Sequence, residues 1–218
     1  MTGLTRTPRV LRGGIVLVDI NTSAIQRVIS LQYNPDTLTR SLQVQGATGD
    51  AADMVDVLRL KGPPVETIKL EAEIDATDQL EHPESNANAA KLGIHPQLAA
   101  LETIVYPPSE QVLANLAQAR SGVMEIVPTV APMQLFVWSR MRVLPVKITE
   151  LSIVEESFDP NLNPLRAKVS LGMRVLSTTD LGFDNKGGSL FMAYFQQKER
   201  LSKLAVGAIT SLGLESLP

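Results

Sequence analysis

Alternating apolar and polar positions predict most of the strands of this chain. Between residues 65 and 75, Ile68, Leu70, Ala72 and Ile74 share one face, while polar or charged side chains occupy the other. This period of two is typical of a strand with one buried face. Together with a continuous apolar run over 15–18, similar alternation predicts about seven strands in total, the others over 25–33, 38–44, 133–138, 146–158 and 167–175.

The pattern of residues 146–158 changes parity between Ile148 and Leu151, which predicts a β-bulge there. A helical segment begins at Ile94-His95-Pro96, where proline in the first turn costs no hydrogen bond. Apolar positions then recur at helical spacing until Pro107-Pro108. A second short helix is expected from Ser109, and a terminal helix is expected over 189–206.

The order of elements is strands, helix, strands, helix, without the βαβ alternation of a doubly wound sheet. We therefore expect a mainly β protein with helices (α+β), built as an antiparallel two-sheet β-barrel or sandwich with a helical insertion and a C-terminal helix. Three regions are expected: a flexible basic arm over 1–12, a β-barrel domain over 13–180, and a C-terminal helix with an apolar docking tail over 181–218.

The terminal helix is expected to be amphipathic. Leu190, Tyr194, Leu201 and Ala205 form one apolar stripe, so we expect residues 189–217 to dock on a partner. Packing of this helix against its own barrel is the alternative.

Composition removes several classes of function. The 218 residues include no cysteine, which excludes thiol catalysis, disulfides and Cys-ligated zinc. The net charge of −3 and the aromatic content of 4% give no reason to expect nucleic acid as a partner. There is no charged-then-apolar leader and no apolar run of about 20 residues, so we expect cytoplasmic synthesis, no signal peptide and no direct membrane insertion.

The residue types that carry chemistry do not form a convincing site. His82 and His95 each precede proline and are expected at a turn and a helix start, not as a metal pair. Glu155 and Glu156 are neighbours on a strand and point to opposite faces, so they cannot share a substrate as glycosidase carboxylates do. Asp159 is expected at the solvated end of that strand.

Other candidate motifs are also incomplete. The stretch 66–84 contains seven acids but no calcium-binding loop, and is expected to be a solvated face or an electrostatic contact with a partner. Gly187-Gly188 lacks the remainder of a phosphate-binding loop, and Ser139 and Ser157 have no histidine partner in a local signature. We expect no catalytic, cofactor-binding or metal-binding residue, no cofactor and no enzymatic activity.

Six segments together resemble the tube-protein family of contractile injection systems, the phage-tail-like particles of bacteria. They run in order through most of residues 13–177. The segments are Leu31–Pro35 (LQYNP), Gly62–Thr67 (GPPVET), Ile94–Glu102 (IHPQLAALE) with Tyr106–Pro108 (YPP), Leu135–Trp138 (LFVW), Arg142–Val146 (RVLPV) and Phe158–Ala167 (FDPNLNPLRA).

The resemblance implies a structural subunit with a tube-like β-barrel core. Such subunits assemble into a six-fold ring of the inner baseplate, joining spike and baseplate to the inner tube and initiating tube assembly. Implied partners are further copies in a hexamer, the inner tube protein, the spike protein and other baseplate components, in a particle that stays in the cytoplasm or is released. Many members carry a peptidoglycan-binding lysine-motif module, whose Tyr-x-Val…Gly-Asp-Thr-Leu pattern does not follow the last strand here.

Two further hypotheses remain open at this point: a small-ligand-binding β-barrel unrelated to injection particles, and a hydrolase with an unrecognised site. For a ring subunit, neighbours are expected to meet through strand edges and the long connector 46–64. The segment Phe158–Ala167 is expected to be a structural turn, with Phe158 inserted into the core.

Overall fold

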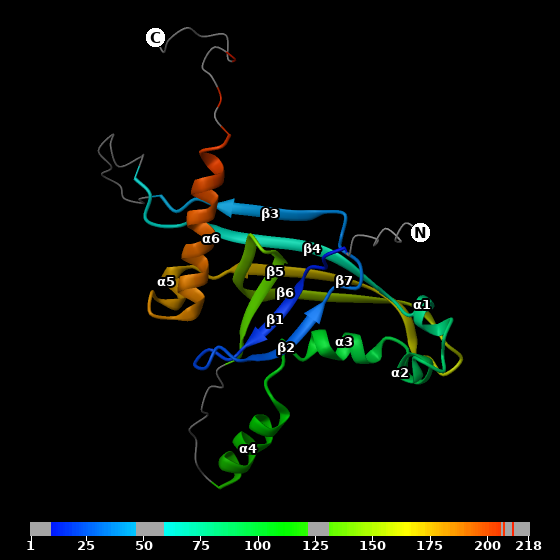
Figure 1. The fold of residues 1–218 in the computed structure, drawn as a ribbon. Coiled ribbons are helices and arrows are strands. Elements are labelled where there is room, and N and C mark those ends of the chain that lie inside the picture. The colour runs from blue at the N-terminus through cyan, green and yellow to red at the C-terminus, as the bar shows by residue number, and fades with distance from the viewer. Residues whose placement is uncertain (1–9, 47–58, 122–130, 206, 208–210, 212–218) are drawn as a thin grey trace, which may run out of the picture.

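The computed structural model describes residues 10–46, 59–121, 131–205, 207 and 211, and a seven-stranded sheet lies at its centre (Figure 1). The strand order is β2-β1-β5-β6-β7-β4-β3, and every neighbouring pair is antiparallel. The strands are β1 (Gly14–Val18), β2 (Ile25–Ser30), β3 (Leu38–Gln43), β4 (Val65–Asp75), β5 (Met133–Ser139), β6 (Arg142–Phe158) and β7 (Pro164–Val175).

The strands form one open sheet, which corrects the expected two-sheet barrel or sandwich. The long strand β6 is the physical reason. Its first residues pair with β5, and from Val146 to Phe158 it pairs with β7. Because ladder hydrogen bonds continue along the whole of β6, the strands before and after it belong to the same sheet.

Alternation located several strands accurately. The strand β4 has the predicted bounds, and Ile68, Leu70, Ala72 and Ile74 are all buried. The predicted bulge is confirmed, since the register between β6 and β7 shifts between Ile148 and Glu150.

The described part of the chain also contains six helices. Of these, α3 begins at His95 with Pro96 in its first turn, as the sequence predicted. The short helices α1, α2 and α5 were not predicted, because four to six residues carry too little periodicity to detect. The helices are α1 (Thr77–Leu80), α2 (Ala87–Leu92), α3 (His95–Glu102), α4 (Ser109–Arg120), α5 (Thr178–Leu181) and α6 (Lys186–Ser202).

The hydrophobic core is one continuous cluster. The sheet contributes fully buried residues such as Phe136, Leu144 and Met173, and α3 adds Ile94 and Leu98. The start of α3 is attached to the sheet, because the Ile94 amide donates to the Pro164 carbonyl oxygen at 2.9 Å.

The helix α6 packs on its own sheet, against β6 (Figure 1). Phe191 and Tyr194 belong to the core, so the first half of this helix packs on its own sheet, which was the alternative. Leu201 and Ala205 of the predicted stripe are exposed, and their docking on a partner stays a prediction. The first turn of α6 also lies close to the end of α5, because a Cβ on Gly188 would lie 2.0 Å from the Gly182 carbonyl oxygen. Of the apolar tail, Ile209, Leu212, Leu214 and Leu217 lie outside the described residues.

The segment after β6 is a turn, as expected. The Asp159 carboxylate holds it by accepting hydrogen bonds from the amides of Asn161 and Asn163, at 2.7 and 2.8 Å. Phe158 does not enter the core, since 50% of it is exposed. It pairs with Pro164 at the tip of the β6–β7 hairpin.

Candidate functional site

The free edge of β2 is the first candidate surface. In the described part of the chain, β2 pairs with β1 alone. Its apolar residues Ile25 and Val28 are 67% and 62% exposed. Its one charged residue, Arg27, turns toward α3, where Nη1 donates to Thr103 Oγ1 at 2.7 Å and to the Ala100 carbonyl oxygen. The edge therefore presents exposed apolar side chains, and its one charged side chain, although exposed, is held against α3 by hydrogen bonds.

The strand β3 forms the opposite edge of the same sheet and has the same character. It pairs with β4 alone among the described residues, and Leu42 is 49% exposed. Its one charged residue, Arg40, is half-buried and donates from Nε to Glu66 Oε1 at 2.8 Å. The exposed positions that alternate with Arg40 and Leu42 along β3 are the uncharged Thr39, Ser41 and Gln43.

Soluble proteins usually protect edge strands with exposed charges, proline or a covering element, because an unprotected edge recruits other strands. Both edge arginines here are instead engaged inside their own protein. The two edges are thus chemically suited to strand pairing with another chain.

Glu66 connects the β3 edge to α6. It is only 3% exposed, although the sequence placed it in a solvated acidic stretch. Its carboxylate accepts from Arg40, from Lys198 Nζ at 2.8 Å and from the Tyr194 hydroxyl at 3.3 Å. Burial acts to raise the pKa of Glu66, but the hydrogen bonds and charges of Lys198 and Arg40 outweigh it and leave that pKa below its usual value. The signal in the sequence was parity, since Glu66 shares a face with Ile68 and Leu70.

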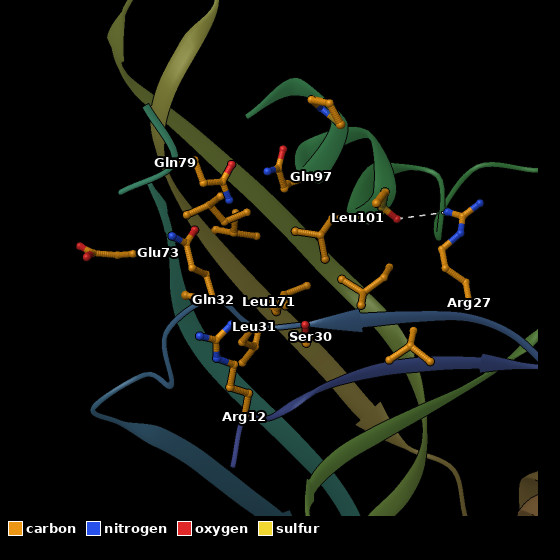
Figure 2. Close-up of a pocket in the computed structure, with 17 residues that line it drawn as sticks. Arg12, Arg27, Ser30, Leu31, Gln32, Glu73, Gln79, Gln97, Leu101 and Leu171 are labelled. Carbon is orange, nitrogen blue, oxygen red and sulfur yellow. Dashed lines mark hydrogen bonds between the residues drawn. The ribbon is translucent and has the colours of Figure 1, made fainter. Parts of the chain in front are cut away.

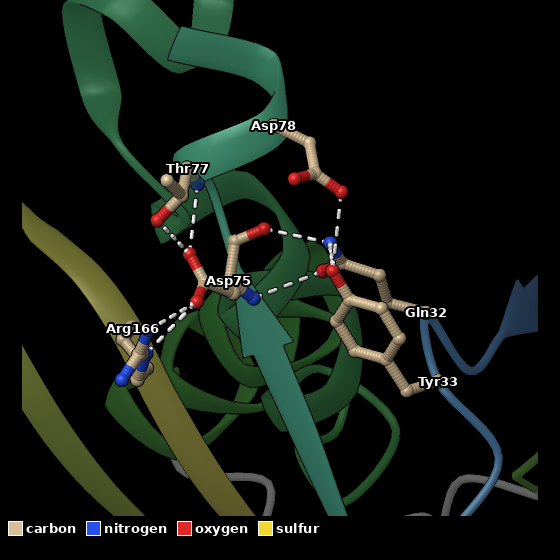
Figure 3. A network of polar contacts seen from close by, with 6 residues as sticks. All are labelled: Gln32, Tyr33, Asp75, Thr77, Asp78 and Arg166. Atoms are coloured by element: carbon tan, nitrogen blue, oxygen red, sulfur yellow. Dashed lines mark hydrogen bonds and ion pairs between the residues drawn. The ribbon is translucent and has the colours of Figure 1, made fainter. Parts of the chain in front are cut away.

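A second polar network connects the segment after β2 with the end of β4 (Figure 3). Asp75, the last residue of β4, accepts hydrogen bonds from the Thr77 amide and hydroxyl, and Arg166 Nε donates to it at 2.8 Å. Burial acts to raise the pKa of Asp75, and these partners lower it below its usual value. From the segment after β2, the Gln32 side chain bonds the Asp75 main chain, and Tyr33 donates its hydroxyl proton to Asp78.

The predicted connector 46–64 continues the β3–β4 hairpin at both of its described ends. Gly46 and Leu60 form an antiparallel bridge, and the Lys61 amide donates to the Gln45 carbonyl oxygen at 2.9 Å. Residues 47–58 lie outside the described residues.

The helix α4 extends away from the sheet (Figure 1). None of its residues is buried, and Val112, Leu113 and Leu116 expose apolar surface. It is a third surface on which apolar side chains face outward.

The residues considered for catalysis do not gather in one cluster, although Asp159 lies within electrostatic range of His95. His95 begins α3, and His82 lies in the turn after α1. Glu155 and Glu156 are adjacent on β6, where Glu156 pairs with Lys168 at 3.3 Å. Within the described ranges, no group of three or more histidine, aspartate and glutamate side chains could hold a metal ion.

The remaining candidates have structural positions. Gly187 and Gly188 lie in the first turn of α6, where Asn185 Oδ1 accepts from the Gly187 amide. Ser139 ends β5, and Ser157 lies near the end of β6 with a φ of 56°. The structure does not bring either serine to a histidine.

Comparison with models of protein families and with curated proteins finds no match to this chain. Among the helices in the described part of the chain, none is both long and apolar enough to cross a bilayer.

Proposed function

We propose that this chain is a structural subunit of a contractile injection particle. In this proposal it forms a hexameric inner-baseplate ring that joins the spike and baseplate to the inner tube and initiates tube assembly. The observation that carries the proposal is the pair of sheet edges β2 and β3, both with exposed apolar residues and with their only charged side chains held by hydrogen bonds within the same chain.

The two edges differ from each other, and this supports a ring. If β2 of one copy pairs with β3 of the next, the growing assembly keeps one free β2 edge and one free β3 edge at its two ends. Such a head-to-tail contact repeats from copy to copy, and the copies form a ring when the rotations between them add up to a full turn. The six segments that resemble tube proteins supply the expected number of copies and the expected partners.

The position of the resembling segments also supports the proposal. Gly62–Thr67 leads into β4, and Ile94–Glu102 contains α3. Phe158–Ala167 forms the β6–β7 turn, and Leu135–Trp138 lies in β5. These segments shape the sheet and its covering helix, which is what a subunit without an active site requires.

Electron microscopy of the purified full chain, alone and with its tube and spike partners, tests the proposal. Six-fold rings, or incorporation into tail-like particles, are the expected result. Mass photometry that finds only a monomer at high concentration, with the partners present, would contradict it.

A further inference from the structure

A cavity of about 400 Å³ lies between α3 and the sheet (Figure 2). Its floor is apolar and includes the buried residues Leu31, Ile74, Leu101 and Leu171. The last residues of β2 and the segment after it form one wall, and α3 forms another. Its size and mostly apolar lining match those of sites that hold small organic molecules.

One polar atom of the lining has no partner. Gln97 comes from the first half of α3, and its Oε1 is fully buried without a hydrogen bond among the described residues. Buried amide oxygens in proteins nearly always accept a hydrogen bond. A ligand with an O–H or N–H donor would satisfy this oxygen.

The charged groups of the lining favour an anion. Arg12 lines the cavity at an exposed position, and its guanidinium has no hydrogen bond or ion pair to any described residue. Arg27 adds a second positive charge, although its Nη1 is engaged with Thr103 and Ala100. The one acid of the lining, Glu73, is exposed and points away from the cavity in Figure 2.

We propose that this cavity binds a small amphipathic carboxylate, with its acid group at Arg12, its apolar body on the floor, and an O–H or N–H donor on Gln97. This goes beyond assembly, because the sheet edges do not require a ligand. Carboxylate and guanidinium form charge-assisted hydrogen bonds, which orient such a molecule in one direction.

Calorimetric titration of the full chain with three probes tests the proposal. Methyl octanoate offers the apolar body with neither a charge nor a hydrogen-bond donor, octanoate adds the carboxylate charge, and ω-hydroxyoctanoate adds a donor at the far end. We expect ω-hydroxyoctanoate to bind most tightly and methyl octanoate least tightly.

Two substitutions separate the contributions. Arg12→Gln should lower the affinity for both carboxylates about fivefold and leave the affinity for methyl octanoate nearly unchanged, as expected for a solvent-exposed ion pair. Gln97→Leu should lower the affinity for ω-hydroxyoctanoate to that for octanoate, since a neutral hydrogen bond contributes about fivefold. The Gln97 oxygen and the Arg12 guanidinium have no hydrogen-bond partner among the described residues, so removing either group breaks no hydrogen bond of that group. Both variants should therefore fold, which thermal unfolding checks.

Matched controls are Arg140→Gln, on the exposed turn between β5 and β6, and Gln118→Leu, on the exposed face of α4. Both should bind all three probes like the unmodified protein. Absence of binding overturns the proposal. Equal affinities for the three probes, or affinities that neither Arg12→Gln nor Gln97→Leu changes, overturn it as well.

Discussion

Gln32 forms two hydrogen bonds with the main chain of Asp75. Its Nε2 donates to the Asp75 carbonyl oxygen at 2.6 Å, and its Oε1 accepts from the Asp75 amide at 3.0 Å (Figure 3). The side-chain amide thus occupies the place of a neighbouring strand. It joins the segment after β2, at one end of the strand order, to the end of β4 near the other.

Replacing Gln32 with leucine should lower the free energy of unfolding by about 1–3 kcal/mol. The reason is that an amide and a carbonyl of Asp75, both partly buried, would lose their partners. Urea denaturation measures the difference. Gln118→Leu on α4 is the control, and equal stability of the two variants would show that the bridge contributes nothing.

Local patterns predicted elements but not their long-range partners. Alternation identified the buried face of β4 and the bulge near Ile148, because both depend on neighbouring residues. The bond between Gln32 and Asp75 spans 43 positions of sequence, and no local pattern marks it. The same limit explains why the sequence suggested two sheets: the continuity of β6 across both halves depends on pairing, not on periodicity.

The candidate surfaces were predicted in part. The sequence indicated that strand edges would be important, but it could not show that hydrogen bonds within the same chain hold Arg27 and Arg40. The cluster around Glu66 was missed because Lys198 lies 132 positions away. The one feature of the sequence that indicated a buried acid is that Glu66 and Ile68, two residues apart, lie on the same face of the strand.

Glu66 should make stability depend on pH. Its folded-state pKa lies below its usual value of 4.5, so the unfolded chain takes up a proton first as the pH falls. Its contribution is therefore present above pH 4.5 and is lost as the pH decreases through the folded-state pKa. Glu66→Gln should be less stable at neutral pH by about 1–3 kcal/mol, and this difference should shrink in acid.

Denaturation at several pH values measures this effect. Asp19, Asp75 and Asp159 also have lowered pKa values, so the comparison between unmodified protein and variant isolates Glu66. Glu71→Gln is the matched control on the exposed face of the same strand. A difference for Glu66→Gln that stays constant from neutral to acid pH would contradict the expectation.

Gly93 should not tolerate a side chain. Its φ is 58°, and a Cβ would lie 2.2 Å from the Pro164 carbonyl oxygen, which also accepts from the Ile94 amide. Gly93→Ala must therefore displace the start of α3 from the sheet, and we expect it to cost about 2 kcal/mol or more. Thermal unfolding measures the loss. Gly62→Ala, where the added carbon meets nothing within 4 Å, should be close to neutral, and similar losses for both would refute this explanation.

Truncation of two phenylalanines should lower stability by very different amounts. Phe191 on α6 is 6% exposed, so Phe191→Ala should lower stability by about 3–5 kcal/mol. Phe158→Ala should cost much less, because half of that side chain is already in water. Chemical denaturation of both variants provides the comparison. A loss for Phe191→Ala no larger than that for Phe158→Ala would contradict the packing of Phe191 in the core.

The two sheet edges should be blocked separately by lysine. Val28→Lys on β2 and Leu42→Lys on β3 each replace an exposed apolar residue, so the fold should be retained while the edge acquires a desolvation cost for pairing. Each variant alone should be a monomer under conditions in which the unmodified chain forms rings. Met141→Lys, an exposed position at the β5–β6 turn, should still form rings.

Mixing the two edge variants distinguishes a head-to-tail contact from a symmetric one. The Val28→Lys copy keeps an intact β3, and the Leu42→Lys copy keeps an intact β2, so together they can form one β2–β3 contact and no second one. An equimolar mixture should therefore give dimers with one copy of each variant and no larger assembly, which native mass spectrometry resolves. If β2 paired with β2, the Leu42→Lys variant would dimerise alone, and if β3 paired with β3, the Val28→Lys variant would. Either homodimer would exclude the head-to-tail arrangement, because a symmetric contact uses the same edge of both copies and cannot by itself propagate into a ring.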